Sequence, residues 1–194
     1  MFAQVEDPEM LRTSFALVVG AALCLSLAGC QQPRLDEMMV QPPRPTELDR
    51  LNAFVGTWEG TSEMKLLGSG ETLQSTGTST VTWEANQWLL VERFEDTMGT
   101  AETKYAGLCI WSWDASTGKY RLDFFDNFGG GGSGTATYDE AQQTWHMTVK
   151  TNYGGQAGWS VGTATFTDPD TMEWEHTQWD SLKLTKCAEM KGTS

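Results

Sequence analysis

The sequence is short of basic residues, histidine and cysteine, and it has little proline beyond residue 45. Against 26 Asp and Glu it has only 13 Lys and Arg, which gives a formal net charge of −13 over 194 residues. A surface so poor in cations does not suit a phosphate backbone, so nucleic acid is excluded as a partner. Two His and four Cys are too few for a zinc-finger array or a disulfide scaffold. The length corresponds to one domain once processed segments are removed.

The apolar run near the N-terminus is too short to cross a bilayer as a helix. It covers residues 15–28 (FALVVGAALCLSLA), follows Arg12 and ends in small residues, a layout typical of a signal peptide. Residues 1–9 are acidic and unlike the start of such a peptide. We therefore expect translation to begin at Met10.

The end of this run carries a lipidation motif. Leu27-Ala28-Gly29-Cys30 resembles the lipobox of bacterial lipoproteins. The resemblance implies cleavage before Cys30, so that residues 1–29 are removed and Cys30 carries the lipid. Two or more acyl chains make anchoring stable. The next residue is Gln31, not the Asp that often retains such proteins in the inner membrane, which favours an outer-membrane, periplasm-facing location in the cell envelope. A plain secretory leader that contains Cys30 is the alternative.

A spacer and a short helix precede the main domain. Residues 30–45 hold four of the six Pro and no hydrophobic periodicity, which is typical of an extended linker. Residues 46–49 (TELD) resemble a capping box, and Leu48, Leu51, Phe54 and Val55 follow at helical spacing. The sequence predicts an amphipathic helix over about 46–54 that packs on one end of the domain, residues 46–194.

From Gly56 onward the pattern changes to strands. Residues 56–66 (GTWEGTSEMKL) alternate strictly between two faces, which indicates a half-buried strand. Turn signals separate further segments of this kind, which are residues 72–84, 88–96, 103–113, 119–126, 134–139, 144–152, 158–167, 171–179 and 182–190. No helical pattern separates these strand segments, so the sequence shows no alternation of strands with helices. The sequence therefore predicts an all-β fold, an antiparallel up-and-down barrel of about 8–10 strands, closed so that no edge remains.

The ordered motifs resemble a known family. Residues 54–60 (FVGTWEG) are similar to the first-strand signature of calycin barrels, and residues 113–120, 125–127 and 166–170 resemble the bacterial domain of unknown function 1579. The resemblance implies a lipocalin-like barrel with no established activity. Calycins place a late Arg over the first-strand Trp, Trp58 here, but only Lys183, Lys186 and Lys191 are basic near the C-terminus. Either the domain lacks this Arg or the printed sequence ends before it.

Candidate catalytic patterns do not hold together. Residues 129–134 match the dinucleotide fingerprint Gly-x-Gly-x-x-Gly, but a strand follows instead of the helix that would receive a pyrophosphate, so we expect a flexible hairpin loop. No Ser–His–Asp arrangement and no metal-ligand spacing stands out. We therefore assign no catalytic residue, metal or cofactor, and whether the chain is an enzyme is left open. Whether Cys109 and Cys187 form a disulfide or stay as two buried thiols is left open.

The aromatic supply fits the lumen of a barrel. The period of two points His146 to solvent and His176 inward, while polar residues (Ser62, Glu92 and Gln178) interrupt inward faces. We expect a small apolar molecule to bind in the lumen. The candidate ligand-binding residues are Trp58, Trp83, Phe94, Trp111, Trp174 and His176. Two alternatives are haem bound by His176, as in nitrobindin-like barrels with a similar Gly-Thr-Trp signature, and an envelope structural module with a solid core.

Overall fold

The structure, a computed structural model, describes residues 40–99 and 103–194. Arg44–Ser194 form one compact unit, and the fold is that of this unit. The predicted signal peptide, Cys30 and most of the predicted linker lie outside the described residues. Across the described ranges, no helix has the length and apolar character needed to span a bilayer.

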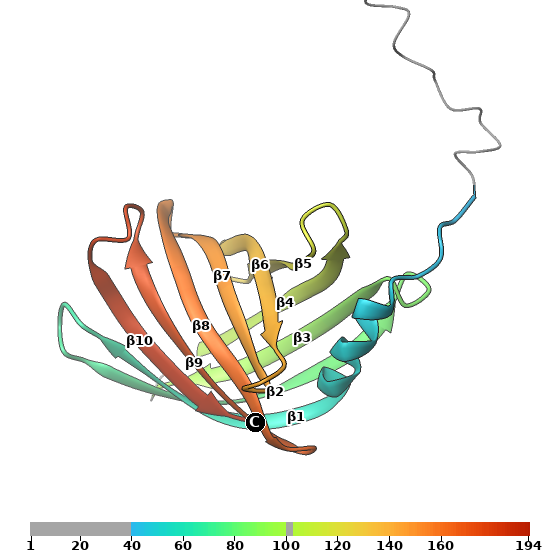
Figure 1. The fold of residues 1–194 in the computed structure, drawn as a ribbon. Coiled ribbons are helices and arrows are strands. Elements are labelled where there is room, and N and C mark those ends of the chain that lie inside the picture. The colour runs from blue at the N-terminus through green and yellow to red at the C-terminus, as the bar shows by residue number, and fades with distance from the viewer. Residues whose placement is uncertain (1–39, 100–102) are drawn as a thin grey trace, which may run out of the picture. The chain divides into compact units, whose positions relative to one another are not determined.

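Ten antiparallel strands form a closed up-and-down barrel, which confirms the predicted fold class (Figure 1). Each strand pairs with its neighbours in the sequence, and β1 pairs with β10 to close the sheet, with Thr61 opposite Thr193. The strands are β1 (Gly56–Leu66), β2 (Thr72–Glu84), β3 (Leu89–Met98), β4 (Thr103–Asp114), β5 (Lys119–Asp126), β6 (Gly131–Asp139), β7 (Thr144–Tyr153), β8 (Gln156–Asp168), β9 (Thr171–Asp180) and β10 (Lys186–Thr193).

Two strand predictions need correction. The flexible loop expected over residues 129–134 is wrong, because β6 begins at Gly131 and pairs Gly132 with Phe124 of β5. The last strand begins at Lys186, four residues later than the predicted start at residue 182. There the Asp180 carboxylate accepts the backbone N–H groups of Leu182 and Leu184, which fixes a turn where the apolar residues had indicated a strand.

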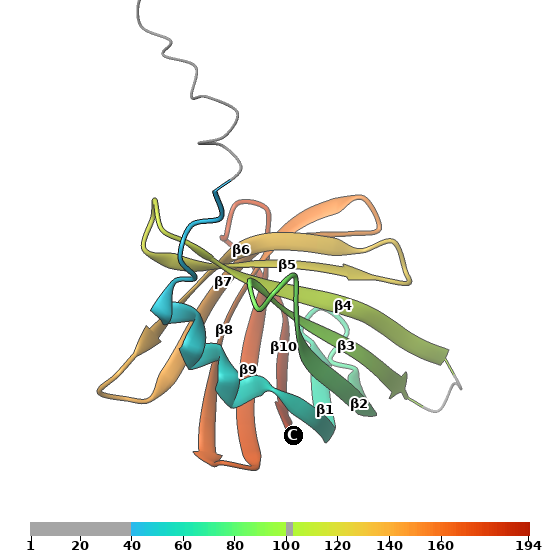
Figure 2. The ribbon, with the colours of Figure 1, turned by 90° about the vertical axis from the view of Figure 1, so that its right-hand side faces the viewer.

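The predicted helix is present as a 3₁₀ helix, η1 (Thr46–Phe54), which lies across one end of the barrel (Figure 2). Its buried residues, Leu48, Leu51 and Phe54, are three apart, which matches the three-residue turn of a 3₁₀ helix. Val55 belongs to the cap and is exposed, so its predicted place on the buried face is wrong. The predicted capping box is also absent. Pro45 is the N-cap and makes no side-chain capping bond.

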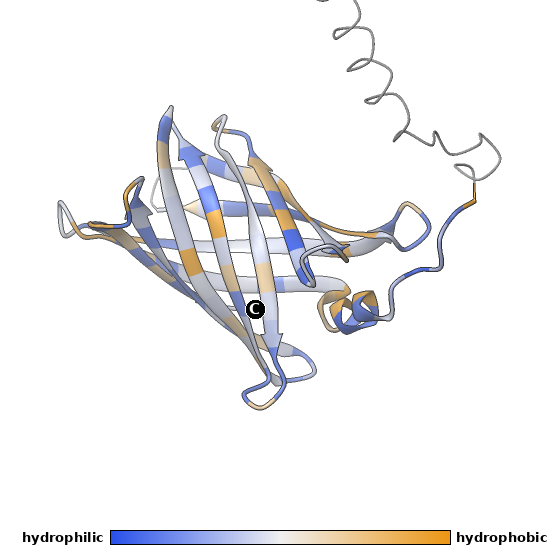
Figure 3. Ribbon diagram, turned by 45° about the horizontal axis from the view of Figure 1, so that its top comes forward, coloured by the Kyte–Doolittle hydropathy of each residue, from blue (hydrophilic) through white to orange (hydrophobic). Residues whose placement is uncertain are grey.

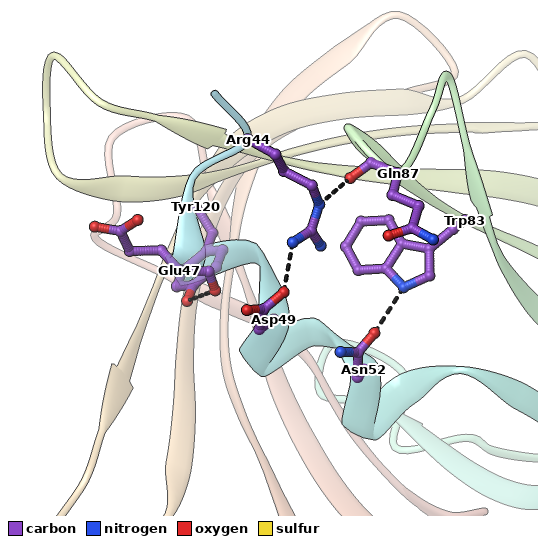
Figure 4. Close-up of polar contacts among 7 residues, drawn as sticks. All are labelled: Arg44, Glu47, Asp49, Asn52, Trp83, Gln87 and Tyr120. Atoms are coloured by element: carbon purple, nitrogen blue, oxygen red, sulfur yellow. Dashed lines mark hydrogen bonds and ion pairs between the residues drawn. The ribbon is translucent and has the colours of Figure 1, made fainter. Parts of the chain in front are cut away.

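Polar contacts fix η1 to the strand ends (Figure 4). The Tyr120 hydroxyl of β5 donates to the Glu47 backbone oxygen at 2.7 Å. The Trp83 indole N–H of β2 donates to Asn52 Oδ1, also at 2.7 Å. Arg44 stacks its guanidinium over the Trp83 ring, 4.8 Å from the ring centre. These contacts hold both ends of η1 against the barrel.

The hydrophobic core lies at the η1 end of the barrel. The Phe54 ring packs within 5.5 Å of the ring centres of Trp111 and Trp145, and Leu48, Leu51 and Trp145 are almost wholly inaccessible to solvent. The Trp58 indole N–H donates to the Phe54 backbone oxygen at 2.8 Å, so the first strand is tied directly to the end of η1. Apolar burial of this extent supplies most of the stability of a domain of this size.

Hydrophobic and hydrophilic residues alternate along the strands (Figure 3). In β7, for example, Trp145, Met147 and Val149 are buried, while His146 and Lys150 are exposed. This alternation is the pattern expected of strands with one face toward a barrel interior and one face toward water.

Candidate functional site

A cavity of about 360 Å³ occupies the barrel interior. Side chains from η1 and from every strand except β6 line it, and Phe54 of η1 forms its floor. The antiparallel register orders its wall into levels. Leu90 and Trp111 lie at the η1 end of the barrel, and Glu92 and His176 lie about halfway along it. Tyr105 and Tyr153 lie toward the opposite end. The volume is at the lower end of the range of small-molecule sites.

The cavity is apolar at its floor and more polar toward the far end. The lining near η1 is part of the hydrophobic core. Toward the far end, Ser62 and Ser75 share a hydrogen bond of 2.6 Å, and Gln178 donates to the Thr151 hydroxyl at 2.7 Å. A gradient of this kind suits a molecule with an apolar body and a polar end.

His176 lies in the middle of the β9 wall. Its imidazole packs edge-on against Trp174, with ring centres 5.6 Å apart, and its Nδ1 is 3.2 Å from the Ser160 hydroxyl oxygen. Its cross-strand neighbour is Gly162, where an added Cβ would lie 2.5 Å from the same Nδ1. Burial lowers the pKa of His176 to about 4, so the imidazole is neutral at neutral pH.

Two carboxyl groups enter the lumen from β3. Glu92 faces the cavity between Val81 of β2 and Cys109 of β4 and forms a hydrogen bond with Ser79. Asp96 lies four residues further along the strand, toward the far end. Burial raises the pKa of both carboxyl groups, because the enclosed wall disfavours their charged forms.

The far end is built around Tyr105. Its ring centre is 5.3 Å from that of Phe94, and its hydroxyl donates to Asp126 Oδ2 at 3.3 Å. The other Asp126 oxygen accepts the backbone N–H groups of Phe128 and Gly130. Asp126 therefore caps the β5–β6 turn and positions Tyr105, and it is not among the lining residues.

Glycines beside large rings keep those rings against the wall. Trp174 stands opposite Gly192 of β10, where an added Cβ would lie 2.5 Å from the ring. Phe124 lies in the same way beside Gly132 of β6, at 2.5 Å. Each ring covers the backbone of a residue that has no side chain. This arrangement explains why β6, rich in glycine, contributes no lining side chain.

Five of the six predicted ligand-binding residues line the cavity: Trp58, Phe94, Trp111, Trp174 and His176. Trp83 is the exception. It shares the inward face of β2 with Val81, but it lies beyond the Phe54 floor, bonded to Asn52 beneath η1. The two-residue period identifies the face of a strand, and the position of η1 decides where along that face the cavity ends.

Several lining residues were not among the predictions, notably Asp96, Tyr105 and Cys109. The two-residue period of side chains along each strand could have identified them. Asp96 is two residues from Phe94, and Cys109 is two residues from Trp111, so both share a face with a predicted lining residue.

Cys109 and Cys187 are both free thiols, and their surroundings differ. Cys109 is in the cavity wall, and burial raises the pKa of its thiol well above the usual range, which makes it a poor nucleophile. Cys187 is exposed on β10. The two residues therefore form no disulfide, and the alternative of two buried thiols is wrong for Cys187.

The late lysines do not take the position of the calycin Arg. Lys183 lies over Trp159 and Lys186 over Trp179, while Lys191 pairs with Glu63 at 3.4 Å. The Trp58 ring instead packs against Phe166, with ring centres 6.0 Å apart. Within residues 40–99 and 103–194, no three His, Cys, Asp or Glu side chains come together as a metal site.

The fold is similar to that of a solved phycobiliprotein lyase. The S-type lyase CPES from Guillardia theta superposes with a TM-score of 0.56 at 10% identity, covering 77% of this chain and 92% of the lyase chain. At this identity the likeness is one of fold.

Two further structures overlap more loosely. EF1p2_mFAP2b bound to DFHBI has a TM-score of 0.38 at 15% identity, covering 75% of this chain and 95% of its own. A DUF3598 protein of unknown function from Nostoc punctiforme has a TM-score of 0.23 at 7% identity, covering 77% and 98%. No protein-family model matches the chain, and no curated protein matches its sequence.

Proposed function

We propose that this chain is a lipid-anchored protein of the bacterial envelope whose barrel binds a small, largely apolar molecule in its lumen. The observation that carries the proposal is the cavity of about 360 Å³, floored by Phe54 and lined by aromatic side chains below a polar far end. A barrel with a solid core would fill this space with side chains. Burial of apolar ligand surface against the floor supplies the affinity.

The proposed location rests on the sequence alone. The motif Leu27-Ala28-Gly29-Cys30 supports lipidation at Cys30, and Gln31 supports an outer-membrane site facing the periplasm. Membership of the domain of unknown function 1579 is part of the same proposal. It is supported by the ordered motifs at residues 113–120, 125–127 and 166–170, which follow the calycin-like signature at residues 54–60.

Uptake of a neutral apolar dye tests the binding function. N-phenyl-1-naphthylamine should bind at one site per chain, gain fluorescence and quench Trp emission. Trp174→Ala removes part of the wall and should weaken binding, whereas Trp159→Ala, a β8 residue outside the cavity lining, should leave it unchanged. Trp174→Ala also costs roughly 3–5 kcal/mol of stability if the site does not collapse, so its fold is checked first by circular dichroism.

Haem bound by His176 is a second candidate, favoured by the position of a neutral imidazole in the cavity wall. Imidazole in this form ligates haem iron through a ring nitrogen. Titration with hemin should then give a Soret band that disappears in His176→Ala, while binding of the neutral dye changes only modestly. A folded wild type that takes up neither dye nor hemin would overturn both candidates and leave the structural module.

A further inference from the structure

The lining of the cavity carries carboxyl groups and no Lys or Arg side chain. The two acids are Glu92 and Asp96, and the imidazole of His176 is neutral because burial lowers its pKa to about 4. A ligand with a carboxylate or phosphate group would therefore meet two acids and no counter-ion. Burying an unpaired anion is unfavourable, so this lumen disfavours anionic molecules such as fatty acids.

Glu92 is the most enclosed of these groups. It is partly buried in the cavity wall, and its neighbours across the sheet are Val81 and Cys109, neither of which is basic. Ser79 supplies a hydrogen bond, but a carboxylate accepts about four, and the cavity is the space left on its free side. An enclosed carboxyl group either loses its charge or is paired with a cation. The lining supplies no cation here, so a cationic ligand is what would hold Glu92 in its charged form.

Asp96 extends the negative wall toward the far end. Its carboxyl group folds over Gly77, where an added Cβ would lie 2.6 Å from Asp96 Cγ, so the space that the acid occupies depends on a glycine. A molecule that enters from the far end passes Asp96 before Glu92. The net charge of −13 favours the approach of cations in the same way.

Aromatic rings complete the surroundings of these acids. Phe94 lies between Glu92 and Asp96 on the inward face of β3, and Trp58 and Trp174 line the same cavity. The faces of aromatic rings attract cations. Below them the floor is hydrocarbon, with Phe54 and Leu90.

We infer that the lumen selects a small hydrophobic amine, whose ammonium group pairs with Glu92 and whose apolar body packs against the floor at η1. The inference rests on the proposed binding function and names the class of ligand for that same cavity. Asp96 attracts the ammonium group at the far end, and the aromatic wall accommodates it during passage.

Three probes that share one ring system test this selectivity. They are 1-naphthylmethylamine, 1-naphthalenemethanol and 1-naphthylacetate, compared at pH 7 by calorimetry and Trp quenching on the whole barrel domain. The ammonium probe should bind at least about tenfold more tightly than the carboxylate, with the alcohol between them, because a charge-assisted hydrogen bond forms only with the first.

The variants Glu92→Gln and Asp96→Asn locate the selectivity. Glu92→Gln should reduce the preference for the ammonium probe by about tenfold while leaving the affinity for the alcohol nearly unchanged. Asp96→Asn should reduce it less. Glu95→Gln is the matched control, because Glu95 is an exposed glutamate of the same strand whose carboxylate pairs with Lys104 at 2.8 Å.

The outcomes separate the two proposals. If the alcohol binds but the carboxylate binds as well as the ammonium probe, the amine inference is wrong and the binding function stands. It is also wrong if the ammonium preference survives in both Glu92→Gln and Asp96→Asn. If none of the three probes binds the folded protein, both proposals are overturned.

Discussion

At the scale of single residues, the two histidines show what a two-residue period can predict. The structure has His146 exposed and His176 in the cavity wall, as their parity in β7 and β9 indicated. The period could not predict that Trp83 lies beneath η1, outside the cavity, or that Glu92 has no basic neighbour in the lining. Those facts depend on which strands the closed barrel brings together, which the pattern of one strand does not contain.

Burial of His176 makes the stability of the barrel depend on pH. Its pKa falls from 6.5 to about 4 on folding, so the unfolded chain binds the proton first as the pH drops. The contribution of this residue is complete above about pH 6.5 and is lost between about pH 6.5 and 4, on the order of 3 kcal/mol. In urea unfolding, the wild type should therefore lose stability relative to His176→Gln as the pH falls from about 6.5 to 4.

The control for this experiment is His146→Gln, which changes an exposed histidine and should follow the wild-type pH dependence. The raised carboxyl pKa values of Glu92 and Asp96 act in the opposite direction, since they favour the folded state as the pH falls. They are common to all three proteins and cancel in the comparison. A constant difference between wild type and His176→Gln from pH 7 to 4 would contradict the assignment.

At the scale of elements, η1 is predicted to stabilise the barrel by closing its end. Leu51 is wholly buried against the core, so Leu51→Ala should lower the free energy of unfolding by about 2–5 kcal/mol. Glu47→Ala is the control. Its side chain is exposed and the Tyr120 bond goes to its backbone oxygen, so we expect a change within about 0.5 kcal/mol. Similar urea midpoints for the two variants would mean that η1 is dispensable.

Strand positions were predictable where alternation and turn residues agreed. The predicted bounds of β1, β2 and β5 match the structure. The first three residues of β6 were not predicted, because a run of glycines is typical of a loop. Here the glycines belong to a strand, and neighbouring rings such as Phe124 fill the space beside them. β10 was displaced because Leu182 and Leu184 are apolar yet exposed, held in a turn by Asp180. In both places a tertiary contact overrides the local signal.

At the scale of the whole molecule, the prediction concerns where the chain resides. In detergent-phase partitioning of cells that express the full chain, the wild type should enter the detergent phase, because acyl chains on Cys30 contribute about 0.8 kcal/mol per buried methylene. Cys30→Ala should move to the aqueous phase. Cys24→Ala, a change inside the predicted signal peptide, should behave as wild type. A wild type in the aqueous phase would show that the lipidation motif is misread.

The pairing of rings with glycines has a consequence for how such a barrel changes over evolutionary time. Glycines such as Gly162 and Gly192 set the width of the cavity, because a methyl group at either position would push the ring of His176 or Trp174 toward the cavity centre. A Gly→Ala substitution would therefore narrow the cavity without changing any side chain that a ligand contacts. Two homologues with the same lining side chains would then accept ligands of different width.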